Sequence, residues 1–370
     1  MAQLTVPAPG SVSPTADSPE GGAYPGRMPD AAPKSVTVVP LLGPLHLRLP
    51  QYNALSVLRS VEAFEPDVVA LVPLLPGSLA DPAWQDCAEL PLPHTVVPWA
   101  RRTGTPLAEV GHRTDDESAE SDFRSYLQSY DGGRALLASV DAEEGPVREL
   151  LERSLTLDSV LDELLPAVER FQQRRREAFG EGPGTGWLEQ RAVRTAEAVL
   201  ALDGARVALL AGADDVPAVQ AALAERVRLE RPPRPAVDDA VRRRSLLDYA
   251  MRGEAPDPQA LLGQLQEIDE PEARYLEANL LLQVGETQEA LEVLEHASTL
   301  DFVEPYYLPG FLLSRLGQLY DLVGRRDAAL RAYRGVRALG YAPAEAVRAA
   351  EAGLERPFAL GEAEPVATAP

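Results

Sequence analysis

The stretch VTVVPLL, residues 36–42, decides the class of fold. It is a nearly continuous run of β-branched and aliphatic side chains, which is typical of a parallel strand buried on both faces. Residues 67–71 repeat this pattern, and between the two runs apolar side chains recur at a helical spacing. These helical positions are Leu55, Leu58, Val61 and Phe64. Strand, helix and strand in this order predict an α/β fold with a mainly parallel sheet flanked by helices.

Further elements extend this sheet along the chain. Residues 106–110 and 206–210 are short apolar runs that predict two more buried strands. Most of residues 115–182 and all of residues 187–202 have the apolar spacing of helices. The alternation of strands and helices therefore continues to about residue 231.

Three short signals mark helix ends in this region. We expect Thr95 to cap a short helix that Gly104 ends, because a hydroxyl accepts a free helical N–H and glycine tolerates the left-handed conformation. Asp214 and Asp215 precede Pro217, a combination that is typical of a helix start. Asp215 is therefore predicted to be a capping residue.

From residue 236 onward the pattern predicts helix pairs and no strand. Small and aromatic residues recur there at spacings that resemble the tetratricopeptide repeat. The residues that carry the resemblance are Leu316, Gly317, Tyr320, Gly324, Ala329 and Tyr333, with a partial copy at Gly285, Ala290, Leu294 and Ala297. The resemblance implies an all-α, tetratricopeptide-like helical array with a concave surface that binds a protein or peptide.

Composition divides the chain into four parts. Residues 1–34 are rich in Pro, Gly, Ala and Ser, so we expect a disordered leader, and residues 359–370 predict a disordered tail. Between them lie an α/β domain over residues 35–231 and the helical array over residues 236–358. A proline-rich hinge separates the two domains.

Charge and composition exclude several classes of function. The chain has 57 acidic and 35 basic side chains, and a net charge of −22 repels phosphate backbones, so we expect no nucleic-acid partner. No apolar run approaches the ~20 residues of a membrane-spanning helix, so we expect no membrane partner. The single Cys87 leaves no partner for a disulfide within the chain, which favours a cytoplasmic protein.

A second resemblance concerns the α/β domain. The segment GPLH, residues 43–46, follows the first predicted strand, and PDVV, residues 66–69, opens the second. This order resembles the opening of the superfamily that includes the TraB/PrgY/TIKI proteins, the ChaN-type haem-binding proteins and the erythromycin esterases. Residues 187–217 are similar to the second half of that superfamily. The resemblance covers roughly residues 35–231 and implies a site at the carboxyl ends of the strands.

The sequence departs from that superfamily at the site. Val72 stands where the second strand usually carries a carboxylate, and Asp215 stands where the second motif places a histidine. Because aspartate can ligate a hard divalent ion, His46 and Asp215, together with Glu109 or His112, form one hypothesis for a divalent metal site. The competing interpretation is a turn histidine bonded to the backbone and a helix-capping aspartate.

Three aromatic residues are candidates for partner binding. Tyr306, Tyr307 and Phe311 lie in and just after a long turn of the helical array, where aromatic side chains supply large contact area. The alternative is that they fill the gap between helix pairs. The sequence contains no Gly-x-Ser-x-Gly elbow and no phosphate-binding loop. We therefore expect a non-catalytic adaptor with a degenerate TraB/ChaN-like domain; the alternative is a metal-dependent hydrolase with an atypical ligand set around His46.

Overall fold

The computed structural model describes residues 33–113, 116–180, 182, 186–253, 257–300 and 305–360. Its strands are β1 (Ser35–Leu41), β2 (Val68–Leu71), β3 (Leu107–Glu109), β4 (Arg206–Gly212) and β5 (Arg228–Glu230). All pairings are parallel, and the strand order is β3-β2-β4-β1-β5. The predicted parallel α/β fold is therefore confirmed.

The four predicted strands occur within two residues of their predicted bounds, whereas β5 was not predicted. Its sequence is Arg-Leu-Glu, which lacks an apolar run, and it pairs with only the first three residues of β1. An edge strand of this length leaves no periodic signal for sequence analysis. Most of the predicted leader and tail, residues 1–32 and 361–370, lie outside the described residues.

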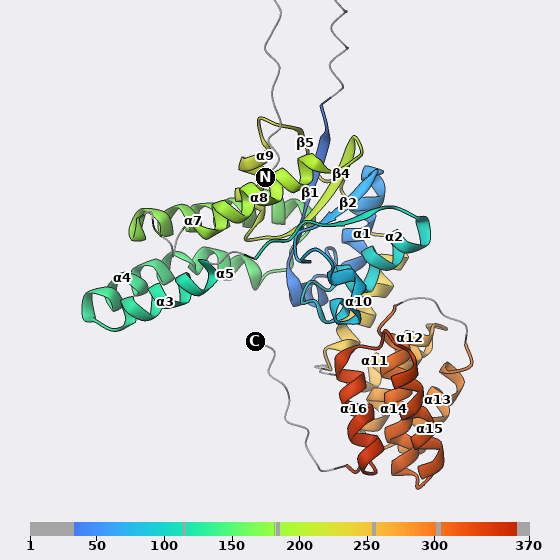
Figure 1. Cartoon of the computed structure of the whole chain (residues 1–370). Helices are drawn as coiled ribbons and strands as arrows, with labels where there is room; N and C mark the ends of the chain where they lie inside the picture. The colour runs from blue at the N-terminus through green and yellow to red at the C-terminus, as the bar shows by residue number, and fades with distance from the viewer. Residues whose placement is uncertain are drawn as a thin grey trace, which may run out of the picture.

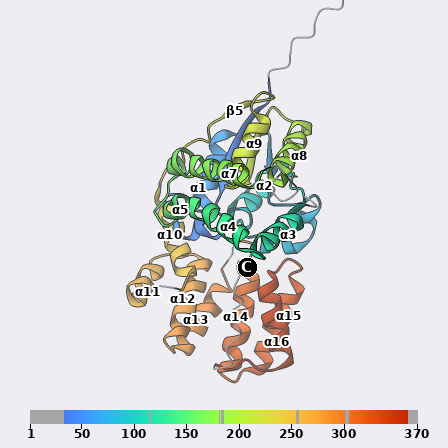
Figure 2. The ribbon, with the colours of Figure 1, turned by 90° about the vertical axis from the view of Figure 1, so that its left-hand side faces the viewer.

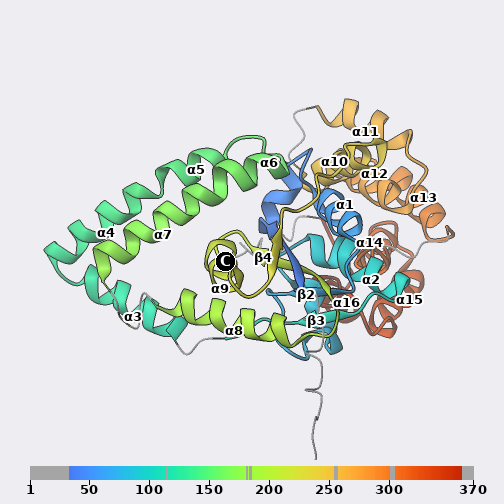
Figure 3. The ribbon, with the colours of Figure 1, turned by 90° about the horizontal axis from the view of Figure 1, so that it is seen from above.

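Helices cover both faces of the sheet. Between β1 and β4 lie the 3-10 helices η1 (Gly43–Arg48), η2 (Ser78–Ala80) and η3 (Pro82–Asp86), the π-helices η4 (Leu92–Val96) and η5 (Val160–Leu164), and the α-helices α1 (Ala54–Phe64), α2 (Val97–Thr103), α3 (Asp116–Gln128), α4 (Asp131–Glu143), α5 (Gly145–Leu151), α6 (Leu157–Ser159), α7 (Leu165–Phe179) and α8 (Trp187–Ala201). Helix α9 (Val216–Leu223) connects β4 to β5. Seen from above, α1 and α2 lie on one side of the sheet, and α8 and α9 lie on the other (Figure 3).

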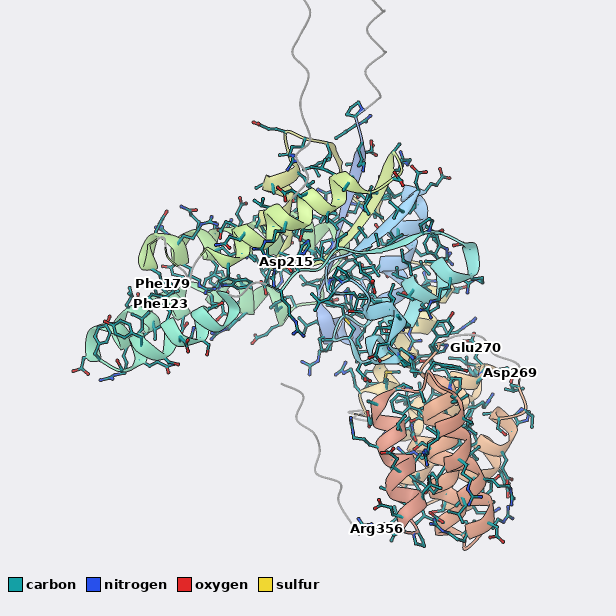
Figure 4. The ribbon with its side chains drawn as sticks, in the orientation of Figure 1. Phe123, Phe179, Asp215, Asp269, Glu270 and Arg356 are labelled. Atoms are coloured by element: carbon teal, nitrogen blue, oxygen red, sulfur yellow. The ribbon has the colours of Figure 1, made fainter. Side chains whose placement is uncertain are left out.

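Helices α3, α4, α5 and α7 form an arm that projects from the sheet (Figures 1 and 3). Phe123 of α3 and Phe179 of α7 stack edge to face with ring centroids 5.5 Å apart, and Figure 4 labels both near one end of α7. The mostly helical character predicted for residues 115–182 is confirmed in the described part of this range.

The prediction that Thr95 caps a helix is wrong. Its segment is already helical from Leu92, as a π-helical turn that continues into α2. The Thr95 hydroxyl donates instead toward the carbonyls of Ala54, at 2.9 Å, and Pro91, at 3.0 Å, so it joins α1 to this segment. The other end of the helix is as predicted, because Gly104 has a left-handed φ of 75°.

Residues after 236 form helices, with no strand among those that the structure describes. They are α10 (Asp239–Met251), α11 (Pro258–Gln266), α12 (Pro271–Gln283), α13 (Thr287–Ala297), α14 (Leu308–Leu322), α15 (Arg326–Ala338) and α16 (Ala344–Glu355). Helices α12 to α16 stand side by side below the α/β part (Figures 1 and 2). Part of the predicted long turn, residues 301–304, lies outside the described residues.

Tyr333 fixes the packing of α14, α15 and α16. A Cβ atom added at Gly317 of α14 would lie 2.3 Å from the Tyr333 ring, and one added at Gly353 of α16 would lie 2.2 Å from it. Both glycines are therefore needed for the ring to lie between the two helices. This packing gives a physical reason for the small and aromatic residues at positions 317 and 333.

The α/β part and the helical array are joined by hydrogen bonds through α10. The Asn53 side chain caps α1 and donates from Nδ2 to the carbonyl of Val241 at 3.0 Å and to Ser245 Oγ at 2.9 Å. Ser245 in turn donates to the carbonyl of Pro50 at 2.8 Å. Asn53 is fully buried, so this contact is part of the folded core at the junction.

Candidate functional site

His46 lies in η1, directly after β1, and only 1% of it is exposed. Its Nε2 accepts a hydrogen bond from the Leu42 N–H at 3.0 Å, so the proton is on Nδ1, which donates to the Tyr52 carbonyl at 2.7 Å. Burial lowers the pKa of His46 to about 4. Because both ring nitrogens bind the main chain, a metal ion on this ring would displace one of these hydrogen bonds.

The turns after β1 and β4 lie side by side, as we expected. Leu41 pairs with Gly212 in the sheet, and Ala213 donates its N–H to the Leu41 carbonyl at 2.9 Å. The Glu89 carboxylate lies between the turns: its Oε2 accepts the Gly43 N–H at 2.8 Å, and its Oε1 lies 3.5 Å from the Cβ position of Gly212. Helices leave these turns toward opposite faces, which makes this edge a common ligand site in open α/β sheets.

Charged side chains at this edge are engaged with one another. Asp215 forms an ion pair with Arg191, whose guanidinium lies 4.6 Å from the centroid of the Trp187 ring. Burial, together with the charges of Asp215 and Asp214, raises the pKa of Glu89. Figure 4 shows Asp215 between the sheet and the arm. We call Glu89, Arg191, Asp214 and Asp215 the strand-end cluster.

The prediction that Asp215 caps a helix is wrong. It occupies the N-cap position of α9, but its side chain makes no capping hydrogen bond there. Its carboxylate instead pairs with Arg191 of α8. An ion pair with a residue 24 positions away cannot be read from the local Asp-Asp-x-Pro pattern.

The other two residues of the metal hypothesis have different surroundings. Glu109 accepts the N–H groups of Gly77, at 2.6 Å, and of Leu79, so it orders the loop after β2. His112 is half-buried, and its Nε2 has no hydrogen-bond partner within the described part of the chain. Within the described ranges, no group of three or more His, Cys, Asp or Glu side chains is arranged to hold a metal ion.

A continuous groove runs along the helical array and reaches the α/β part. It consists of three pockets, the largest of about 410 Å³, and neighbouring pockets share lining residues. The largest of the three and the middle pocket share Tyr275, Phe311, Arg315 and Glu345. The middle pocket and the far pocket share Gln318, Ala349 and Phe358. We call this continuous surface the array groove.

The largest pocket lies at the junction of the two parts of the molecule. The α/β part contributes Gln85 and His94, and the array contributes Asn279 and Arg315 among others. Its volume falls in the range of ordinary ligand pockets. Binding here would therefore require both parts of the chain.

Four residues that line this pocket each have a buried polar atom with no hydrogen-bond partner among the described residues. These atoms are Gln85 Oε1, His94 Nδ1, Asn279 Oδ1 and Arg315 Nε. Gln85 and His94 are 8% and 9% exposed, so they lie well inside the fold. The orientation of the Gln85 amide is set because its Nε2 donates to the Tyr341 carbonyl. Buried polar atoms are nearly always paired, so an unpaired group at a pocket indicates a missing partner.

A buried ion-pair network contacts Tyr307, one of the residues that line this pocket. Arg244 of α10 binds Asp248 at 2.7 Å and makes two hydrogen bonds of 2.7 Å to Glu272 of α12. Tyr307 donates its hydroxyl to Glu272, and its ring centroid lies 4.8 Å from that of His94. Burial and the nearby Arg244 charge lower the pKa of His94 to about 3, so its ring is neutral.

The three aromatic residues predicted to bind a partner have separate positions. Tyr306 is half-buried against the α/β core, with Arg101 5.8 Å from its ring centroid. Tyr307 is 6% exposed and lines the largest pocket. Phe311 is half-buried and lines two pockets of the array groove. Only Tyr307 and Phe311 therefore face the candidate site.

Sequence reasoning missed the polar residues of the groove. Gln85, Asn279 and Arg315 belong to no recognisable motif, and His94 directly follows the proline-rich residues 90–93 without a motif of its own. Asn279 of α12 and Arg315 of α14 are separated by 36 positions, and they line the same pocket only in the folded chain. The available signal was the group of aromatic residues in and just after the long turn, two of which line the groove.

Comparison of the chain with protein-family models, with curated proteins and with solved structures gave no match. In the part of the chain that the structure describes, no helix has the length and apolar character needed to cross a bilayer. The case for a function therefore rests on the geometry and chemistry of the array groove itself.

Proposed function

We propose that this chain is a non-catalytic adaptor that binds an extended segment of a partner protein in the array groove. The observation that carries the proposal is that four residues lining one pocket at the domain junction each have a buried polar atom without a hydrogen-bond partner among the described residues. Such atoms cost stability unless a bound molecule or water pairs them. The tetratricopeptide resemblance of the array supports the same class of function.

The chemistry of these atoms favours a peptide main chain. Gln85 Oε1 and Asn279 Oδ1 accept hydrogen bonds, whereas Arg315 Nε donates one. His94 is neutral, so its ring can donate or accept according to tautomer. A peptide backbone offers both N–H donors and C=O acceptors along its length. It therefore complements this mixed set better than a simple anion or cation does.

The groove also has apolar surface that can bind side chains of the partner segment. Tyr275 and Phe311 line both larger pockets, and their ring centroids lie 6.4 Å apart. Aromatic residues in a partly desolvated groove are typical anchors for a bound segment. The proposed ligand is thus an extended stretch with at least one apolar side chain.

Selection from a random-peptide phage library tests the proposal. We expect selected peptides to bind the full chain saturably in calorimetry, and Asn279→Ala to weaken that binding about tenfold. Val284→Ala is the matched control, because Val284 lies directly after the same helix and is 62% exposed. Selected peptides whose affinity is unchanged by Asn279→Ala, Phe311→Ala and Arg315→Ala would contradict the proposal.

A further inference from the structure

The segment after α16 returns to the array groove. Arg356 is extended, with φ −144° and ψ 151°, and lies at the end of the array furthest from the sheet (Figure 4). Two residues later, Phe358 lines both the middle and the far pocket of the groove. A part of the chain's own C-terminal region therefore already lies against the surface proposed for a partner.

A specific hydrogen bond holds this segment. The Phe358 N–H donates to Asp321 Oδ2 at 2.9 Å, and the Asp321 side chain is fully buried. The same carboxylate binds Arg326 at 2.9 Å and accepts the Tyr333 hydroxyl at 3.0 Å. A fixed, buried carboxylate that receives a main-chain N–H is a preorganised contact, because hydrogen bonds to charged acceptors are strong.

The segment lies on the surface of the array and not in its core. Phe358 is half-buried, and its neighbours Pro357 and Ala359 are exposed. The apolar core of this part of the array is made of other residues, chiefly Ala329, Tyr333, Val336, Ala346 and Ala350. Phe358 can thus leave its position without opening the core.

We infer that residues 357–359 are an intramolecular occupant of the array groove, and that the partner segment takes their place when it binds. The inference rests on the proposed function and makes it more specific. The partner presents an extended stretch whose phenylalanine-like side chain enters the position of Phe358 and whose main-chain N–H reaches Asp321. The groove is therefore partly closed to its partner until the chain's own segment leaves.

The probe is a synthetic peptide of residues 356–360, RPFAL, with blocked ends and a fluorescent label. An attached segment acts at an effective concentration in the millimolar range, so the intact chain resists replacement by the free peptide. We expect Phe358→Ala in the full chain to bind the peptide at least about tenfold more tightly than the unchanged chain does. Leu360→Ala is the control, since Leu360 is 61% exposed, and it should behave as the unchanged chain.

Hydrogen exchange of the Phe358 amide in the unchanged chain gives a measurement that needs no variant. We expect this amide to be protected, and a phage-selected groove peptide to remove the protection. Equal or absent binding of RPFAL by both chains, or protection that persists under saturating selected peptide, overturns the inference. Selected peptides that still depend on Asn279 would in that case leave the proposed function standing, which separates the two failures.

Discussion

His46 and His94 are both buried histidines of the α/β part, and they differ in what their rings bind. His46 engages main-chain groups through both nitrogens, at 3.0 and 2.7 Å. His94 Nδ1 has no partner among the described residues, and His94 lines the largest pocket of the array groove. The first ring is typical of a structural turn residue, and the second is typical of a site that is completed by a ligand.

The position of a residue in the fold is therefore a weaker indicator of function than a buried polar atom without a hydrogen-bond partner. The strand-end cluster occupies the edge where open parallel sheets bind ligands, and yet its Glu89 and Asp215 are engaged by a turn and by Arg191. The array groove has no comparable motif, but residues that line it from both parts of the molecule have buried polar atoms without a hydrogen-bond partner among the described residues.

The largest expected effect comes from breaking the buried ion-pair network. Arg244→Met leaves the carboxylates of Asp248 and Glu272 buried without their counter-charge, so the free energy of unfolding should fall by about 3–5 kcal/mol in urea titrations. Arg243→Met is the matched control. Arg243 pairs with Glu270 at the surface, and its loss should cost less than about 1 kcal/mol. Equal losses for the two variants would show that the network is not buried.

The next effect concerns pH and compares the two histidines directly. Burial lowers the pKa of His46 to about 4 and that of His94 to about 3, whereas an unfolded histidine titrates near 6.5. Between pH 6.5 and 4 the unfolded chain therefore binds protons that the folded chain does not, so each histidine lowers stability as pH falls.

The measured quantity is the slope of unfolding free energy against pH. His46→Gln and His94→Gln should each remove a slope of about 1.4 kcal/mol per pH unit in this range, relative to the unchanged chain. Burial raises the pKa of Asp248 to about 6, so this residue raises stability as pH falls. It is present in the unchanged chain and in both variants, so its contribution cancels in the comparison. Parallel profiles for the variants and the unchanged chain would refute the burial of these rings as neutral groups.

The smallest effect on stability is expected in the groove, where the effect on binding is largest. Asn279→Ala removes a polar atom without a hydrogen-bond partner among the described residues, so the free energy of unfolding should change by no more than about 0.5 kcal/mol. Binding of a selected peptide should weaken about 5- to 30-fold, since one hydrogen bond to a ligand is lost. Glu89→Gln at the strand-end cluster should leave that affinity unchanged. Weaker binding by Glu89→Gln, with unchanged binding by Asn279→Ala, would indicate that the peptide binds at the sheet edge instead.

Sequence analysis predicted the main features of the fold because buried strands and amphipathic helices leave periodic signals. Residues 36–42 and 206–210 were recognisable as strands, and they pair residue for residue from Ser35 with Arg206 to Leu41 with Gly212. Strand β5 was not predicted because three residues are too few to show an alternating apolar pattern. The prediction for Thr95 failed because its segment is already helical from Leu92, and its hydroxyl bonds to the Ala54 and Pro91 carbonyls.

The site was predictable only in part. Tyr307 and Phe311 were identified as aromatic residues in and just after a long turn, and both line the groove. The unpaired atoms of Gln85 and Asn279 were not identified, because the absence of a hydrogen-bond partner is a property of three-dimensional packing. The same limit applies to Glu89, which reaches the turn at Gly43 from a loop 46 positions away.

The most direct test of the account is to map a phage-selected peptide on the isotopically labelled full chain by nuclear magnetic resonance. The side-chain amide signals of Gln85 and Asn279 report on the array groove, and the main-chain amides of Gly43 and Gly212 report on the strand-end cluster. Binding in the array groove should give saturable shifts of the two side-chain signals, with the two glycine signals unmoved. Shifts of the glycine amides without shifts of Gln85 and Asn279 would contradict it.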